Sequence, residues 1–312
     1  RVDNHELARD LGCSAADIES LSGVESRYYA ADGEGPSDLA KRAAESTFRE
    51  AQVSAADVEF VIFATMTPDV TFPGSGCYLQ DKLGCGTIGA LDVRAQCAGF
   101  LFALDIAMQF LKAGRYRRIL LAAGDVHSSG LDFSPRGAAV TPLFGDGAAA
   151  VILGEEGENI VESVIHTDSS HFERFWCEFP SSRRLPTRFL SDDLERAKHY
   201  PTIDADAVKR DGLGQIEAAV NEVLDKSGTR PEHVRRYFLQ HVFREVAAAA
   251  ADSLGVRDRC TIGGRDEGHV ASASLPIALD RARGSGEVKA GDLVCLATAG
   301  SGANSGAALV RL

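Results

Sequence analysis

The chain has 312 residues, of which 45% are hydrophobic and 25% are charged, so it can form one large or two ordinary globular domains. Its formal net charge of -12 argues against nucleic acid as the main partner, because proteins that bind phosphate backbones usually carry an excess of Lys and Arg. Seven widely spaced cysteines, and the lack of an apolar run of the roughly 18 residues that span a bilayer, predict a cytoplasmic protein with reduced thiols, no metal site and no membrane partner.

The first half of the chain alternates between helical and extended patterns. Residues 37–51 follow the helical pattern, because Leu39, Ala43 and Phe48 recur on one face. Residues 118–125 are almost continuously apolar, as expected for a strand that is buried on both faces. Alternation of helices with buried strands indicates an α/β fold with a mainly parallel sheet. Helices are predicted over residues 3–11, 14–21, 37–51 and from 72 to 83, and strands over residues 58–65 and 118–125.

Cys97 lies where an extended segment meets a helix, with Phe100 and Leu104 following at helical spacing. A thiol attacks as a thiolate, and the backbone N–H groups and the dipole at a helix N-terminus are expected to lower its pKa. The small residues Ala98 and Gly99 would let a substrate carbonyl approach the main chain. Cys97 is therefore a candidate nucleophile. The alternative is one more buried cysteine, which is the expectation for the other six.

The second half of the chain repeats the first in the same order. Each half has a short polar segment before a strand, an Ala- and Leu-containing helix, a Lys-Ala-Gly turn and a Gly- and Ala-rich closing strand. Several matches in one order favour a duplicated α/β unit over chance similarity. We therefore predict two halves, residues 1–155 and 156–312, that pack as pseudo-twins. The matching segments are residues 54–58 with 230–234, 102–107 with 277–282, 111–114 with 288–291, and 145–153 with 304–312.

Residues 166–200 interrupt this repeat. The segment has little periodicity, but it contains Phe172, Phe175, Trp176 and Phe179. A loop of this length inside a compact protein is often functional, so it is a candidate lid or substrate rim. A solvated excursion held by a few anchoring aromatic side chains remains an equal alternative.

Four segments, in this order and spacing, resemble the β-ketoacyl-acyl-carrier-protein synthase III family. They are residues 71–77 (TFPGSGC), 92–100 (DVRAQCAGF), 136–137 (RG) and 144–150 (FGDGAAA), and the glycine-rich closing segment adds to them. The resemblance covers essentially the whole chain. It implies an α/β, thiolase-like fold with the two pseudo-duplicated halves in a five-layered α-β-α-β-α arrangement, usually in a homodimer. It also implies a first strand before Arg1.

The resemblance implies an acyltransferase in which Cys97 takes an acyl group from a thioester and passes it to an acceptor. His241, at the end of a predicted strand in the second half, takes the place of the family's catalytic histidine. His269 stands where the family has an asparagine, so the catalytic set becomes Cys-His-His. A neutral imidazole can donate a hydrogen bond as an amide does, but it can also act as a base.

The oxyanion of a tetrahedral intermediate requires backbone donors. The N–H of Cys97 is one of them. The loop 299–303, with Gly300 and Ser301, is similar to the family's glycine run that supplies the second. A tight turn before the last strand describes the same loop equally well.

Substrate recognition departs from the family at several positions. Asp17 and Leu21 stand where the family has the Trp and Arg of its coenzyme A site, which favours an acyl donor on the phosphopantetheine of an acyl carrier protein over free acyl-CoA. No other cofactor is expected. Arg136 matches a family arginine near the adenine and phosphate. The residues expected to contact the substrate are Arg136, Phe72, Phe243 and Arg244.

Three functions stay open at this point. The first is decarboxylative condensation of acyl-Cys97 with a malonyl group on a carrier protein, in fatty acid or polyketide biosynthesis. The second is transfer of the acyl group to a hydroxyl or amine of a small molecule in specialised metabolism, without decarboxylation and with His241 as base. The third is a degenerate partner subunit of a condensing heterodimer, which the presence of Cys97 and His241 argues against.

Overall fold

The structure is a computed structural model, and it describes residues 1–154, 160–183 and 190–312. The helices of the described residues are α1 Asn4–Leu11, α2 Ala15–Ser22, α3 Pro36–Ala51, α4 Ser75–Leu83, α5 Gly99–Lys112, α6 Ser191–Glu195, α7 Ala205–Ser227, α8 Arg244–Ser253 and α9 Ser274–Gly284. The strands are β1 Val2–Asp3, β2 Ser26–Arg27, β3 Phe60–Ala64, β4 Gly89–Val93, β5 Arg118–Asp125, β6 Gly147–Gly154, β7 Ile160–Thr167, β8 Phe175–Trp176, β9 Thr202–Ile203, β10 Arg236–Gln240, β11 Cys260–Thr261, β12 Leu293–Gly300 and β13 Asn304–Arg311.

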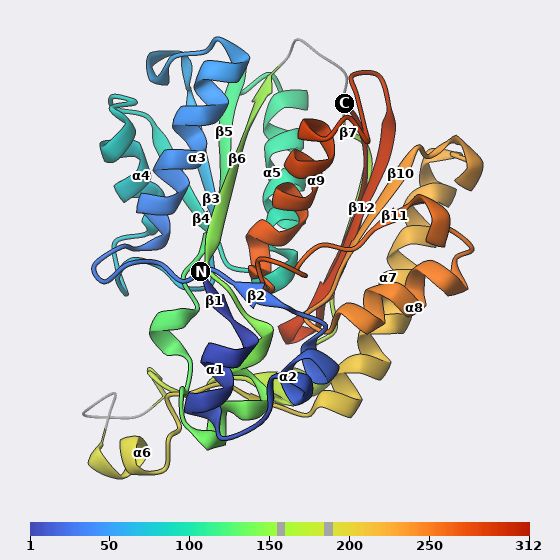
Figure 1. The fold of residues 1–312 in the computed structure, drawn as a ribbon. Coiled ribbons are helices and arrows are strands. Elements are labelled where there is room, and N and C mark those ends of the chain that lie inside the picture. The colour runs from blue at the N-terminus through green and yellow to red at the C-terminus, as the bar shows by residue number, and fades with distance from the viewer. Residues whose placement is uncertain (155–159, 184–189) are drawn as a thin grey trace.

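Two sheets and three layers of helices make up the body of the molecule (Figure 1). Helices α3 and α4 cover the outer face of the first sheet, α5 and α9 lie between the two sheets, and α7 and α8 cover the outer face of the second. This is the five-layered arrangement that the resemblance implies, and the thiolase-like fold class is confirmed. Among the described residues, no helix combines the length and the apolar character needed to cross a membrane.

The two sheets repeat one topology. The first has the order β4-β3-β5-β6, and the second has the order β11-β10-β12-β13-β7. In each sheet the first three strands run parallel and the fourth is antiparallel to its neighbour. The predicted duplication is therefore present in the strand order itself. The predicted boundary between residues 155 and 156 falls within 155–159, outside the described residues.

The inner helices also begin alike. A 3-10 turn, Gln96–Ala98, precedes α5, and a second 3-10 turn, Ala271–Ala273, precedes α9. In both turns the first residue has a positive φ, 45° in one and 37° in the other, although neither residue is glycine. The two turns approach each other closely at Gly99, because a Cβ there would lie 3.1 Å from the Cβ of Ser272. The duplication thus brings the turn that carries Cys97 against its own twin.

One apolar cluster joins the two halves. It contains Ile62 of β3, Leu101 of α5, Phe238 of β10 and Leu275 of α9, and each of these side chains is at most 1% exposed. Side chains packed this densely give little room for movement. The two halves therefore hold the turn before α5 in a fixed position.

The outer edge of the first sheet differs from that of the second. Strand β13 pairs with β7, whereas β6 pairs only with β5 among the described strands. A groove of about 650 Å³ runs beside β6, between Thr47 of α3 and Ile277 of α9.

Candidate active site

Cys97 sits in the turn before α5 and is 3% exposed. The helix itself begins two residues later, at Gly99. Its Sγ atom lies 3.2 Å from Nε2 of His269, which comes from the other half of the molecule. The duplicated fold therefore brings together a thiol and an imidazole that are 172 residues apart in the sequence.

The prediction of a lowered thiol pKa is wrong. Burial raises the pKa of Cys97 to about 12, because a thiolate loses its hydration in the interior. The N–H groups of Ser301 and of Cys97 itself act in the opposite direction, and the nearby Asp125 carboxylate raises the pKa further. The resting thiol is therefore protonated at neutral pH.

His241 follows directly after β10, as predicted, and is 2% exposed. The backbone N–H of Phe243 lies 3.1 Å from its Nδ1 and the carbonyl oxygen of Phe243 lies 3.3 Å from the same atom, so Nδ1 has a partner in either neutral tautomer. Burial lowers the pKa of His241 to about 4, which keeps the ring neutral. On α7, Gly212 lies against Nε2, and a Cβ at that position would overlap it. His241 is thus a neutral imidazole in a tight cradle.

His269 precedes the turn of the second half and is 3% exposed. Burial lowers the pKa of His269 to about 3, and His127 and His241 lower it further by charge repulsion. Its Nδ1 lies 3.4 Å from Oγ of Ser274, which accepts a hydrogen bond from the N–H of Val270 at 2.8 Å. A hydroxyl can donate or accept, so either neutral tautomer of His269 has a partner at Nδ1.

The predicted oxyanion loop lies against the nucleophile. Strand β12 ends at Gly300, where a Cβ would lie 2.5 Å from the Cβ of Cys97 and 2.7 Å from its Sγ. The N–H of the next residue, Ser301, interacts with the thiol. Its hydroxyl donates to the carbonyl oxygen of Phe175. The structure therefore brings Gly300 and Ser301 to Cys97, and only a glycine allows the contact at 300.

A buried carboxylate joins the two halves beside the nucleophile. Asp125, the last residue of β5, accepts hydrogen bonds from the N–H of Met66 at 2.7 Å, from Thr65 Oγ1 at 3.1 Å and from the N–H of Ser272 at 3.1 Å. The Ser272 hydroxyl also bonds to it. Sequence reasoning treated Asp125 only as the end of a strand, and its position after an apolar run is the signal that could have found it.

Two of the predicted substrate contacts lie away from these residues. Arg136 donates to Oδ2 of Asp132 at 2.5 Å and lies 5.6 Å from the ring centre of Tyr200. Phe72 is 79% exposed, on the loop before α4. Neither residue lines the cavity at His241.

The other two predicted substrate contacts, Phe243 and Arg244, pack against other parts of the protein. Phe243 is fully buried, and Nζ of Lys209 lies 4.7 Å from its ring centre. Arg244 donates to three carbonyl oxygens, those of Gly23, Ile262 and Gly263, at 2.9 to 3.1 Å. The contacts of these two side chains therefore give no support to the predicted substrate role. The chain turns away immediately after His241 to begin α8, which proximity in sequence did not reveal.

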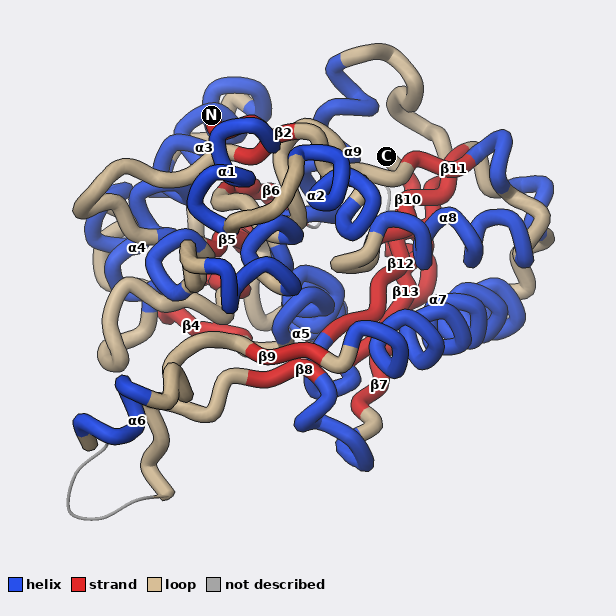
Figure 2. Tube along the Cα trace, turned by 60° about the horizontal axis from the view of Figure 1, so that its bottom comes forward, coloured by secondary structure: helices blue, strands red, loops and turns tan. Residues whose placement is uncertain are grey.

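A cavity reaches His241 and the oxyanion loop, and the sequence did not predict most of the residues that line it. Its volume is about 510 Å³. One wall comes from residues 168–175 of the segment predicted as a lid or rim, so for these residues the rim interpretation fits the structure better than the solvated excursion. Figure 2 shows β8 and β9 of this region side by side, with α6 at the periphery. Besides His241 and residues 300–303, the lining residues are Asp168, His171, Phe172, Arg174 and Phe175, and on α7 Val208, Arg210, Asp211, Gly212, Gly214, Gln215 and Ala218.

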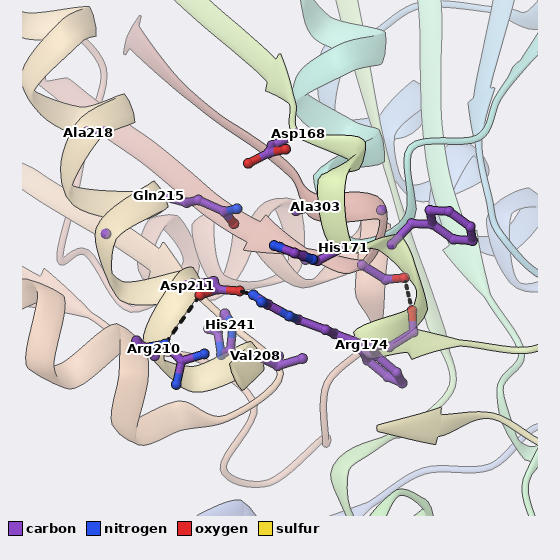
Figure 3. A pocket seen from close by; sticks show the side chains of 17 residues that line it. Asp168, His171, Arg174, Val208, Arg210, Asp211, Gln215, Ala218, His241 and Ala303 are labelled. Atoms are coloured by element: carbon purple, nitrogen blue, oxygen red, sulfur yellow. Dashed lines mark hydrogen bonds and ion pairs between the residues drawn. The ribbon is translucent and has the colours of Figure 1, made fainter. Parts of the chain in front are cut away.

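One part of the wall of this cavity is charged. Arg174 forms an ion pair with Asp211 across it, and Nε of Arg210 lies 3.6 Å from the other carboxylate oxygen (Figure 3). Asp168 and His171 add two further ionisable groups. Such a wall suits a substrate that carries polar groups, because an alkyl chain would remove these charges from water without replacing their hydrogen bonds.

Comparison with known proteins gives one family. Residues 91–169 match the family model of 3-oxoacyl-[acyl-carrier-protein] synthase III, and residues 224–312 match that of its C-terminal part. The chain is 34% identical to the β-ketoacyl-[acyl-carrier-protein] synthase III of Rhodobacter capsulatus over 99% of this chain and 94% of the relative.

Solved structures agree. The 3-oxoacyl-[acyl-carrier-protein] synthase III of Aquifex aeolicus VF5 superposes with a TM-score of 0.89 at 28% identity, covering 100% of this chain and 95% of that one. The priming β-ketosynthase from the R1128 polyketide biosynthetic pathway superposes with a TM-score of 0.88 at 26% identity, covering 99% and 92%. The chain therefore belongs to the 3-oxoacyl-[acyl-carrier-protein] synthase III family of condensing enzymes.

Proposed function

We propose that this protein transfers an acyl group from a thioester to Cys97 and then joins it to a malonyl group held on an acyl carrier protein, with loss of CO₂. The observation that carries the proposal is the 3.2 Å contact between Sγ of Cys97 and Nε2 of His269, beside the loop that supplies the Ser301 N–H. The relatives that the chain matches are named β-ketoacyl-[acyl-carrier-protein] synthase III.

In the first half-reaction the thiol proton of Cys97 passes to Nε2 of His269 as sulfur attacks the thioester carbonyl. For this step Nδ1 of His269 carries a proton, and Oγ of Ser274 accepts it in a hydrogen bond. The N–H groups of Cys97 and Ser301 stabilise the oxyanion. When the intermediate collapses, the leaving thiolate takes the proton from His269, so an acyl-Cys97 and a free thiol remain.

In the second half-reaction the malonyl thioester enters and its carbonyl oxygen accepts a hydrogen bond from Nε2–H of His241. His269 donates a second in its other tautomer, with the Ser274 hydroxyl donating to Nδ1. The malonyl carboxylate leaves as CO₂ and its electron pair becomes the enolate. The enolate carbon attacks the acyl carbon, the bond from that carbon to the Cys97 sulfur breaks, and the released thiolate takes up one proton from water.

The remaining features of the proposal concern partners. The acyl donor is a phosphopantetheine thioester, preferably on a carrier protein, and no other cofactor takes part. Seven free cysteines fit a cytoplasmic setting. We further propose a homodimer through β4, which is one of the two edge strands of the first sheet among the described strands and carries the 37% exposed Leu91.

Intact-protein mass spectrometry against a panel of acyl-thioesters tests the first half-reaction. We expect one acyl mass on the wild-type protein and none on Cys97→Ala. Labelled malonyl-carrier then tests the second, and release of labelled CO₂ during turnover is the expected result. Failure of Cys97 to acquire any acyl mass would instead favour a degenerate partner subunit.

A second candidate function is transfer of the acyl group from Cys97 to a hydroxyl or amine of a polar small molecule. It is favoured by the ion pair of Arg174 with Asp211 in the cavity wall, and by a histidine at position 269, which can take a proton where an asparagine cannot. Turnover of the acyl-enzyme without loss of CO₂ from malonyl-carrier would select this function.

A further inference from the structure

Asn304, the first residue of β13, uses its whole side-chain amide within the protein. Its Nδ2 donates to Oε1 of Gln96 at 2.8 Å and to the carbonyl oxygen of Ser301 at 2.9 Å. Its Oδ1 accepts from Oγ1 of Thr167 at 2.7 Å. The residue is 8% exposed, so these bonds are largely shielded from water. Asn304 therefore connects three separate segments, and both N–H donors of its amide are used within the protein.

The first of these segments sets the direction of the Cys97 N–H. Gln96 has a φ of 45°, a left-handed conformation that is unfavourable for a residue with a side chain and persists only where the surrounding contacts hold it. The peptide plane between Gln96 and Cys97 contains the N–H of the nucleophile. Whatever holds Gln96 in this conformation therefore aims that donor.

The second segment sets the direction of the other donor. The N–H of Ser301 interacts with the Cys97 thiol, and the carbonyl of the same residue accepts the bond from Asn304. Gly302, the next residue, has a φ of 92°, and a Cβ there would lie 2.6 Å from Nδ2 of Asn304. The glycine thus leaves the space in which the amide reaches both segments.

We propose that Asn304 is a positioning residue that holds the two oxyanion donors, the N–H groups of Cys97 and Ser301, at a fixed separation. The proposal rests on the proposed acylation of Cys97. Asn304 itself touches no reacting atom and acts through Gln96 and Ser301. A shift of about 1 Å in a group that stabilises a transition state can cost roughly 100-fold in rate, so a loosened pair of donors slows acylation measurably.

The test compares two reactions of one thiol. Acylation by a thioester passes through an oxyanion, whereas alkylation by iodoacetamide displaces iodide and forms none. Asn304→Leu removes the amide at similar size, and Gln96→Met removes the Gln96 amide, including the acceptor Oε1, while Asn304 stays intact. We expect each variant to lose about 10- to 100-fold in the single-turnover acylation rate and clearly less in the alkylation rate, which the two N–H groups affect only through the pKa of the thiol.

Ser163→Ala is the matched control. Oγ of Ser163, on β7 of the same sheet, donates to Oδ1 of Asp105 at 2.6 Å and has no contact with Gln96 or Ser301. Its loss removes one hydrogen bond of similar geometry, so we expect both rates to stay at the wild-type value. The double variant Gln96→Met with Asn304→Leu should acylate no more slowly than the slower single variant, because both changes break one connection.

The outcomes separate the two proposals. An acylated wild type together with unchanged acylation of Asn304→Leu and Gln96→Met would overturn the positioning role alone, and so would equal losses in acylation and alkylation. No acyl mass on the wild type would overturn the proposed function and the positioning role with it. Should Asn304→Leu fail to fold, Gln96→Met still decides, because it leaves the bonds of Asn304 to Ser301 and Thr167 in place.

Discussion

The turns before α5 and α9 have nearly the same backbone and opposite chemistry. Cys97 in the first turn faces Nε2 of His269 and the oxyanion loop. Ser272 occupies the same place in the second turn, but its hydroxyl lies 3.0 Å from the carbonyl oxygen of Ala64 and bonds to the Asp125 carboxylate. The duplicated turn places a side chain at the start of each inner helix. The segments packed against each turn decide whether that side chain can act as a nucleophile.

The largest expected effect comes from moving the thiol between the twins. Cys97→Ala should lower turnover by at least about 10⁴-fold, because the covalent route is lost. The double variant Cys97→Ala with Ser272→Cys should not recover it, because position 272 faces a carboxylate and not an oxyanion loop. Acyl mass on residue 272, located by peptide mass spectrometry, would contradict the difference that we infer between the two turns.

The second effect concerns the imidazole of His269, which faces Cys97 in the first turn and has no counterpart at Ser272 in the second. His269→Ala should reduce the rate of CO₂ release from malonyl-carrier by about 10²- to 10⁴-fold, because a hydrogen-bond donor and a proton acceptor are both lost. His269→Asn keeps a donor and should retain more of this step than of the acylation of Cys97. Equal losses in the two steps would show that the base function is not specific to acylation.

The third effect is a pH dependence of stability. The folded pKa of His241 is about 4 and that of His269 is about 3, below the ordinary value near 6.5 in the unfolded chain. The unfolded state therefore binds more protons below pH 6.5, and stability is fully present above that pH and is lost as the pH falls toward the folded values. Between pH 8 and pH 5 each imidazole should remove on the order of 2 kcal/mol.

Urea unfolding at the two pH values measures this loss. His269→Asn should reduce the difference by the share of one imidazole, on the order of 2 kcal/mol. A variant that loses as much stability as the wild type over this range would contradict the assignment of the lowered pKa to a buried His269.

The smallest effect concerns the second twin. Ser272→Ala removes the hydroxyl that bonds to Asp125, and the carboxylate keeps the N–H groups of Met66 and Ser272. We expect a loss of about 1–3 kcal/mol in the free energy of unfolding, measured with urea. Acylation of Cys97 in the folded variant should stay within a factor of about 3, and a larger loss would mean that Asp125 also orients the nucleophile.

Local patterns predicted much of the secondary structure. Residues 118–125 form β5 over the same range, because a run of apolar residues suits a strand covered on both faces. Asp3 and Ser14 cap α1 and α2 as their side chains predict. The pairing of segments in the two halves also predicted the duplicated α/β unit, and the repeated strand order agrees with it.

Distant groups decided the chemistry of the site. The expected helix-terminus effect on Cys97 was outweighed by burial, which depends on every segment that excludes water from the thiol. Phe243 and Arg244 follow His241, yet they pack into the protein because the chain turns there to begin α8. Asn304 gave no signal, because its partners lie 208 and 3 residues away in the sequence.

The sequence by itself determined the α/β pattern, the duplication and the identity of Cys97, His241 and His269, because each is written in neighbouring residues or in a motif. Only the tertiary structure decided which way the pKa of Cys97 moves, which side chains line the cavity and what aims the two N–H donors. These properties are sums over groups that meet only after the two halves have packed, so no local stretch of the chain contains them.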